Sequence, residues 1–98
     1  MGQPQPLSKI GKQFLKSLGR GAFVGMVLRL YKSQIKKIVG TKDFARYITG
    51  QQITDDNKLL IYCSNDQWRA ELQARRYQIR QQINRRLDKD FITEVIIK

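Results

Sequence analysis

The sequence has no histidine and a single cysteine among its 98 residues. Without histidine there is no Ser-His-Asp triad, no Cys-His pair and no imidazole ligand for a metal ion. One cysteine excludes an internal disulfide and any zinc or iron–sulfur site built from several thiolates. Phosphate-binding glycine motifs are absent too, since neither a P-loop nor a Gly-x-Gly-x-x-Gly run occurs. These absences point away from an enzyme, and they predict neither a metal nor a cofactor.

Long apolar runs are also missing. The longest, residues 21–28, has eight residues and ends at Arg29, whereas a membrane-spanning helix needs about 20. The same run lies too late in the chain for a signal peptide, and no cleavage region accompanies it. The sequence therefore predicts a protein of the cytoplasm with no membrane span.

The length and the hydrophobic content of 41% suit one folded domain. Residues 1–6 contain both prolines and no anchoring apolar side chain, so we expect a disordered tail there. The single domain is predicted to span residues 7–98.

Acidic residues are absent from the first 42 positions, which carry nine Lys or Arg. Residues 43–98 carry ten basic and eight acidic side chains, so most of the net charge of +11 lies in the first part. This asymmetry predicts a polyanionic partner: nucleic acid first, then an anionic membrane surface or an acidic protein. A solvated basic face that only maintains solubility is the remaining explanation. The residues expected to attract phosphate are Lys9, Lys12, Lys16, Arg20, Arg29, Lys32, Lys36 and Lys37.

Apolar residues at helical spacing predict two helices in this basic part, over residues 8–18 and 22–39, the second ended by Gly40. A short helical turn is expected over 43–47. The pattern then alternates, which predicts a hairpin of two strands over 48–54 and 59–63.

A long helix over 66–87 and a strand over 91–97 complete the predicted chain. The expected order is α-α-β-β-α-β. Three strands with helices on one face make a two-layer α+β domain.

The predicted long helix has an apolar face made by Leu72, Ile79 and Ile83. Arg69, Arg76 and Arg80 lie along one flank of that face, and either form a second row of phosphate contacts or an ordinary solvated flank. Paired carboxylates occur only in predicted turns, where aspartate is ordinary turn chemistry.

The sequence also predicts whether three further side chains are buried or exposed. Trp68 is expected to pack in the core rather than to stack on a base, and Cys63 to be a small buried hydrophobe. Tyr77 is expected on the outer face of the long helix, where it either stacks on a base or is a tolerated surface residue.

The stretch from Leu59 to Leu72 resembles the DciA-type family of bacterial replicative-helicase loaders, long catalogued as a domain of unknown function. The family has an alternating apolar strand, a short Ser-containing turn, and a helix with an aromatic or apolar residue before Glu-Leu. The corresponding residues are Leu59, Ile61, Cys63, Ser64, Trp68, Glu71 and Leu72; Ile38-Val39-Gly40, Phe44-Ala45, Asn84 and Leu87 also fit. Two positions depart, since Ile35 and Asp88 stand where the family often has tryptophan and glycine.

The resemblance implies a KH-like fold, a role in replication initiation in bacteria, the replicative helicase DnaB as partner, and affinity for DNA. A KH domain that clamps RNA does so with a Gly-x-x-Gly loop, and this sequence has none. Binding is therefore expected to rest on the basic surface.

We predict a non-enzymatic, DNA-binding adaptor for helicase recruitment or loading, with single- and double-stranded DNA both open as ligands. Two alternatives stay open: an RNA- or ribosome-associated KH-like factor, and a protein-interaction module with a basic face.

Overall fold

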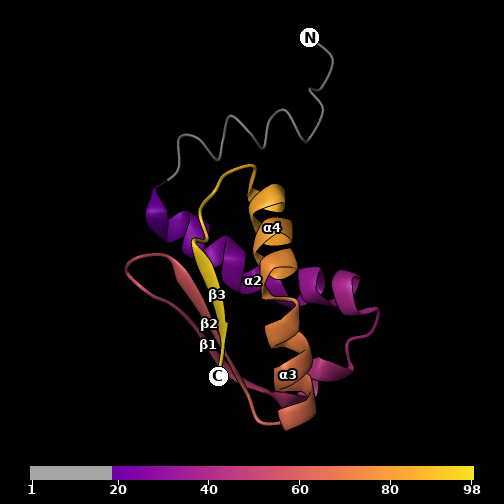
Figure 1. Ribbon diagram of the computed structural model, residues 1–98. Coiled ribbons are helices and arrows are strands. Elements are labelled where there is room, and N and C mark those ends of the chain that lie inside the picture. Colours follow the sequence, from indigo (N-terminus) through magenta and orange to yellow (C-terminus); the bar gives the residue numbers. More distant parts are fainter. Residues whose placement is uncertain (1–18) are drawn as a thin grey trace.

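The computed structural model describes residues 19–98 (Figure 1). The predicted tail 1–6, the predicted helix 8–18 and three of the predicted phosphate-contacting lysines, Lys9, Lys12 and Lys16, lie outside the described residues. The elements in chain order are α2 (Arg20–Val39), η1 (Asp43–Tyr47), β1 (Ile48–Ile53), β2 (Lys58–Cys63), α3 (Asp66–Ala74), α4 (Arg76–Leu87) and β3 (Glu94–Ile97).

The three strands form one mixed sheet in the order β1-β2-β3. β1 and β2 are antiparallel and make the predicted hairpin, while β2 and β3 are parallel with Leu59 opposite Val95 and Ile61 opposite Ile97. Parallel neighbours need a long crossover, which α3 and α4 supply. The domain is thus of the α+β class, as predicted.

One face of the sheet carries the core. Successive side chains of a strand point to opposite faces, and Leu59, Ile61 and Val95 are buried together against the helices. α2 contributes Phe23 and Tyr31 on its buried stripe. Figure 1 shows the helices gathered on one side of the sheet, which confirms the two-layer arrangement.

The start and end of α2 follow from local chemistry. The helix begins two residues before the predicted position, at Arg20, and ends at Val39. Gly40 then adopts φ 83°, and its amide donates to the carbonyl of Lys36 at 2.8 Å. Glycine enters this left-handed region without the steric cost that a Cβ brings, so the predicted stop is confirmed.

The prediction of one uninterrupted helix over 66–87 is wrong. The chain leaves helical hydrogen bonding at Arg75, whose amide donates to the carbonyl of Leu72, three residues back, at 3.1 Å. α4 restarts immediately, with the Ile79 amide donating to the Arg75 carbonyl at 3.0 Å. The interruption separates α3, which packs against β2 and β3, from α4, which packs against α2 and β3.

The last strand is shorter than predicted, because it begins at Glu94 rather than at Phe91. Phe91 and Ile92 are buried, but they approach the sheet from the loop after α4. Phe91 stacks on Phe23 with ring centroids 5.2 Å apart. The apolar character of Phe91 and Ile92 thus reflects their burial and not membership of a strand.

The aromatic and thiol predictions are confirmed. Trp68 is half-buried and packs on Phe44, with ring centroids 6.0 Å apart. Cys63 is buried. Tyr77 lies on the outer side of α4 and is 64% exposed.

Candidate nucleic-acid interface

Three cations form a row on α2. At 100° per residue Arg29, Lys32 and Lys36 fall within one narrow arc, opposite the stripe that buries Val27 and Tyr31. All three are exposed. None of the ion pairs within residues 19–98 involves them. We call these residues the α2 row.

Lys37 is also exposed, on a flank beside this row. Together with Lys36 it lies in the last turn of α2, where the partial negative charge of the helix end favours cations. Local structure alone therefore accounts for part of the basic content here. The exposed charge is nevertheless available to an approaching polyanion.

Arg20 has a different position from the α2 row. Its Nε donates to Oδ1 of Asn57 at 2.9 Å, and its Nη2 donates to the carbonyl of Thr54 at 2.5 Å. Both acceptors belong to the turn between β1 and β2. Arg20 therefore ties the beginning of α2 to the hairpin.

Arg69 is also held within the fold. Its guanidinium forms an ion pair with Asp66 and donates to the carbonyl of Cys63 at 2.8 Å. Its Nε is buried without a hydrogen-bond partner in the described structure. The side chain thus braces the turn between β2 and α3.

Arg76 and Arg80 lie beside the exposed ring of Tyr77. The guanidinium carbons are 5.2 Å and 6.0 Å from the ring centroid. These distances suit cation–π attraction, which extends to about 6 Å. Of the three arginines predicted on one helix flank, the structure brings these two together, and Arg69 does not join them.

Arg80 stands at the junction of two adjoining hollows between α4 and the segment that leads into β3. The hollow beside Tyr77 has a volume of about 440 Å³ and is also lined by Arg76, Thr93 and Glu94. The second has a volume of about 870 Å³, and Arg80 and Thr93 line it as well. We call the two together the α4–β3 trough.

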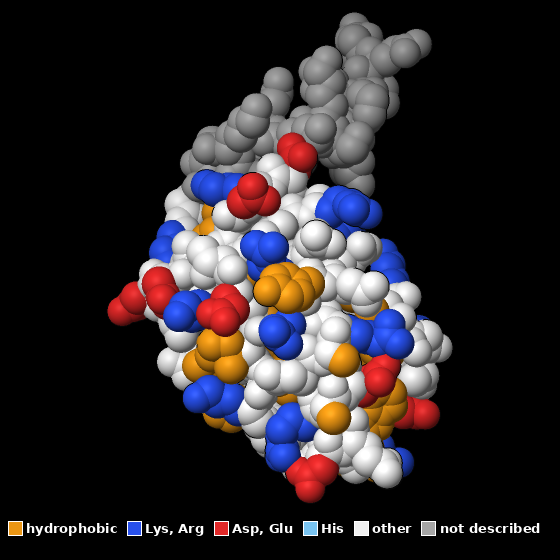
Figure 2. Space-filling view, in the orientation of Figure 1, with side chains coloured by type: hydrophobic (Ala, Val, Ile, Leu, Met, Phe, Trp, Pro, Cys, Tyr) orange, Lys and Arg blue, Asp and Glu red, His pale blue; other side chains and the backbone are white. Residues whose placement is uncertain are grey.

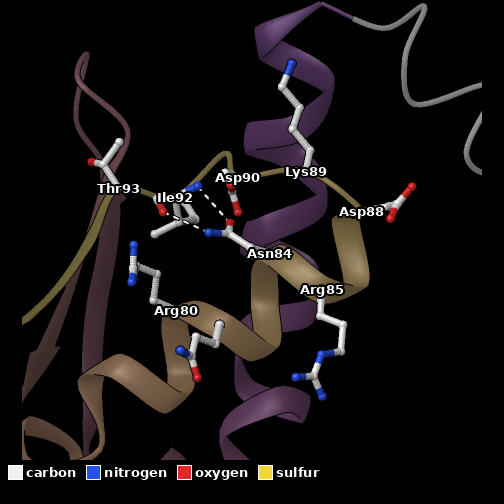
Figure 3. A pocket seen from close by; sticks show the side chains of 9 residues that line it. Arg80, Asn84, Arg85, Asp88, Lys89, Asp90, Ile92 and Thr93 are labelled. Carbon is white, nitrogen blue, oxygen red and sulfur yellow. Dashed lines mark hydrogen bonds between the residues drawn. The ribbon is translucent and has the colours of Figure 1, made fainter.

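Figure 3 shows the second hollow from close by. Arg80 extends from α4 toward Thr93, whereas Arg85 and Asp88 point away from the hollow. The dashed lines mark the hydrogen bonds that join Asn84 to Ile92 at its floor. Apart from Ile92, the residues that line this hollow are polar or charged.

Sequence reasoning missed the β3 side of the trough. Lys58, Thr93, Glu94 and Val95 line the hollow beside Tyr77. Lys58 lies on β2, before α3 and α4 in the chain, and the other three follow the loop after α4. Only the pairing of β2 with β3 brings them together. No local pattern could have found them.

The charges of the trough are unevenly compensated. Lys58 pairs with Glu94, with Nζ and Oε2 3.6 Å apart, and also with Asp56 at 3.5 Å. A hydrogen bond from the Thr54 hydroxyl is the main cause that lowers the pKa of Asp56, with Lys58 contributing. Within the described residues, Arg76 and Arg80 have no such carboxylate partner.

Cationic side chains are spread over the face drawn in Figure 2, and near its centre a hydrophobic patch lies between them. No helix in the described part of the chain is long and apolar enough to span a membrane. In residues 19–98 no group of three His, Cys, Asp or Glu side chains is arranged to hold a metal ion.

The fold and this surface define a small α+β domain that presents cations on two helices. A scan against models of known families matches residues 6–97 to the DnaC/DnaI antecedent, DciA. The chain belongs to the DciA family, as the resemblance in its sequence indicated. Membership implies a role in loading the replicative helicase. Neither the curated proteins nor the solved structures include a match.

Proposed function

We propose that this protein is a non-enzymatic, cytoplasmic adaptor that binds DNA through its exposed cations and helps to recruit or load the helicase DnaB. Family membership over residues 6–97 is the observation that carries the helicase part. The α2 row supports the DNA part, because exposed cations without acidic partners release counterions from phosphate when they bind it.

Contacts of this kind position a protein on the phosphate backbone without reading bases. We therefore expect weak sequence preference and strong salt dependence. The KH-like fold that the family resemblance implies comes without the usual nucleotide clamp, since the chain has no Gly-x-x-Gly loop. The basic surface has to provide the affinity.

The test is capture of purified DnaB by the tagged protein after nuclease treatment, combined with DNA binding by fluorescence anisotropy. One variant carries Lys32→Glu, Lys36→Glu and Lys37→Glu. A matched control reverses the same amount of charge at other exposed positions, Lys42, Arg86 and Lys98.

Wild-type capture of DnaB without nucleic acid, with DNA affinity lost in the α2 variant and largely kept in the control, supports the proposal. Absence of DnaB capture contradicts the helicase part. Equal loss of DNA affinity in both variants contradicts a specific role of α2. If structured RNA outcompetes DNA, the protein is an RNA-associated factor, and if nothing but DnaB binds, it is a protein-interaction module.

A further inference from the structure

Tyr77 is unusual among the large hydrophobic side chains of the described structure. Only Tyr77, at 64%, and Leu28, at 37%, are exposed within residues 19–98. Tyr77 belongs neither to the buried core cluster nor to the partly buried hydrophobic side chains packed against it. Burial in the core therefore does not account for its position.

The neighbours of Tyr77 suit a nucleotide. Arg76 precedes it and Arg80 follows one turn later, and both guanidinium groups lie within about 6 Å of the ring. An aromatic face stacks on any base, and guanidinium groups bind phosphate with two parallel hydrogen bonds. Ring and cations together match a base and its flanking phosphates.

The half-buried arginines differ in whether a carboxylate pairs with them. Four arginines of α3, α4 and the residue between them are half-buried. Arg69 pairs with Asp66, and Arg75 pairs with Glu71 through Nε and Oε1 at 2.6 Å. Arg76 and Arg80, the two that line the trough, have no ion pair within the described chain. The Nη1 group of Arg76 donates only to the Gln73 carbonyl, at 3.1 Å.

The two hollows of the trough differ in charge. The larger hollow is lined by both signs of charge: the acidic Asp88 and Asp90, and the basic Arg80, Arg85 and Lys89. In the hollow beside Tyr77 the one carboxylate, Glu94, is paired with Lys58. A volume of about 440 Å³ there falls within the range of small-ligand sites.

We infer that the part of the trough formed by Arg76, Tyr77 and Arg80 binds single-stranded DNA, with Tyr77 stacked on a base and the two arginines on adjacent phosphates. The inference rests on the proposed DNA binding and adds a preference to it. A duplex keeps its bases stacked inside the helix, so Tyr77 has nothing to stack on there. The α2 row, in contrast, attracts phosphates of either form.

The experiment compares binding of a fluorescent oligothymidylate with binding of a duplex of equal length. Tyr77→Ala is expected to weaken single-strand binding about 5- to 100-fold, the effect of losing one base stack, with little change for the duplex. Tyr77→Phe keeps the ring and should keep the affinity. Arg86→Gln, an exposed arginine of the same helix that lines no part of the trough, is the matched control.

The arginines have their own readout. Arg76→Gln and Arg80→Gln should each lower the slope of log affinity against log salt by about 0.7 on a single strand. Arg86→Gln should leave this slope closer to that of the wild type. Equal slopes for all three variants overturn the assignment of the phosphates.

Photo-cross-linking identifies the contact directly. With iodouracil in the oligonucleotide, the expected cross-link lies on the tryptic peptide that contains Tyr77. A cross-link confined to α2, or unchanged single-strand affinity in Tyr77→Ala, overturns the inference while DNA binding itself stands. A wild-type protein that binds neither form of DNA overturns the proposed DNA binding instead. If Tyr77→Ala loses DnaB capture and keeps DNA, the surface is a protein-docking site and the inference is wrong.

Discussion

The side-chain amide of Asn84 satisfies both backbone groups of Ile92. Oδ1 accepts from the Ile92 amide at 2.8 Å, and Nδ2 donates to the Ile92 carbonyl at 2.9 Å. Asn84 is 7% exposed and Ile92 is 1% exposed. The asparagine thus replaces the strand pairing that Ile92 lacks, and it holds the loop after α4 against the helix.

Asn84→Ala should lower the free energy of unfolding by about 2–4 kcal/mol, because it leaves two buried backbone groups without partners. Urea denaturation measures the change. Gln81→Ala, at an exposed position of the same helix, should change stability by no more than about 0.5 kcal/mol. A loss below 1 kcal/mol for Asn84→Ala would mean that water or another group takes over the bonds.

Replacing Gly25, inside α2, and Gly40, directly after α2, by alanine should change the stability in opposite directions. No described neighbour lies within 4 Å of a Cβ added to Gly25 or Gly40, so backbone conformation decides both cases. Gly25 is inside α2, and Gly25→Ala should stabilise by about 0.5–1 kcal/mol. Gly40 has φ 83°, and Gly40→Ala should destabilise by about 1–2 kcal/mol. Thermal unfolding of both variants tests this, and equal signs would contradict it.

Burial raises the pKa of Tyr31 to about 12, while its hydroxyl donates to Oε1 of Gln51 at 2.5 Å. An unfolded tyrosine titrates near 10, so the fold favours the protonated phenol. Its contribution is complete below pH 10 and is lost as the pH rises toward 12. Tyr31→Phe should lack this alkaline loss. Urea denaturation of both proteins between pH 8 and 12 measures the difference, and parallel curves would refute it.

The exposed lysines of α2 should dominate the salt dependence of duplex binding. Neutralising Lys32, Lys36 and Lys37 to glutamine should reduce the slope of log affinity against log salt by roughly 2–3, because each duplex phosphate contact contributes about 0.9. Anisotropy titrations between 50 and 300 mM salt measure it. An affinity of the wild type that does not weaken over this range would exclude electrostatic binding.

Arg20→Lys separates structure from charge at the start of α2. Lysine keeps the charge but lacks the planar fork that reaches Thr54 and Asn57 together. We expect a loss of about 1 kcal/mol in stability, with DNA affinity within twofold of the wild type. An unchanged stability with a fivefold weaker affinity would instead assign Arg20 to phosphate binding, as its sequence position suggested.

Several elements could be predicted because local signals are strong there. The apolar spacing of α2 and the glycine after it specify a helix and its end. Alternation in β2 specifies a strand with Leu59, Ile61 and Cys63 on the buried face. The family motif spans these same elements, so the resemblance and the periodicity agree.

The break at Arg75 could not be predicted. The residues around it are good helix formers with neither glycine nor proline, so no local signal opposes a continuous helix. Both halves pack on β3, but α3 also packs on β2 whereas α4 also packs on α2. The same break sets Arg69 apart from Arg76 and Arg80, which a single helix would have aligned.

The sequence by itself determined the class of this protein: a small α+β domain, strongly basic in its first part and without histidine. Only the tertiary structure decided which cations are used inside the fold and which face outward. Arg20 and Arg69 donate to backbone carbonyls of the hairpin turn and of β2, whereas Arg76 and Arg80 flank an exposed ring, with Arg76 also donating to the Gln73 carbonyl. Composition counts charges, but the packing of distant segments decides which charges have partners.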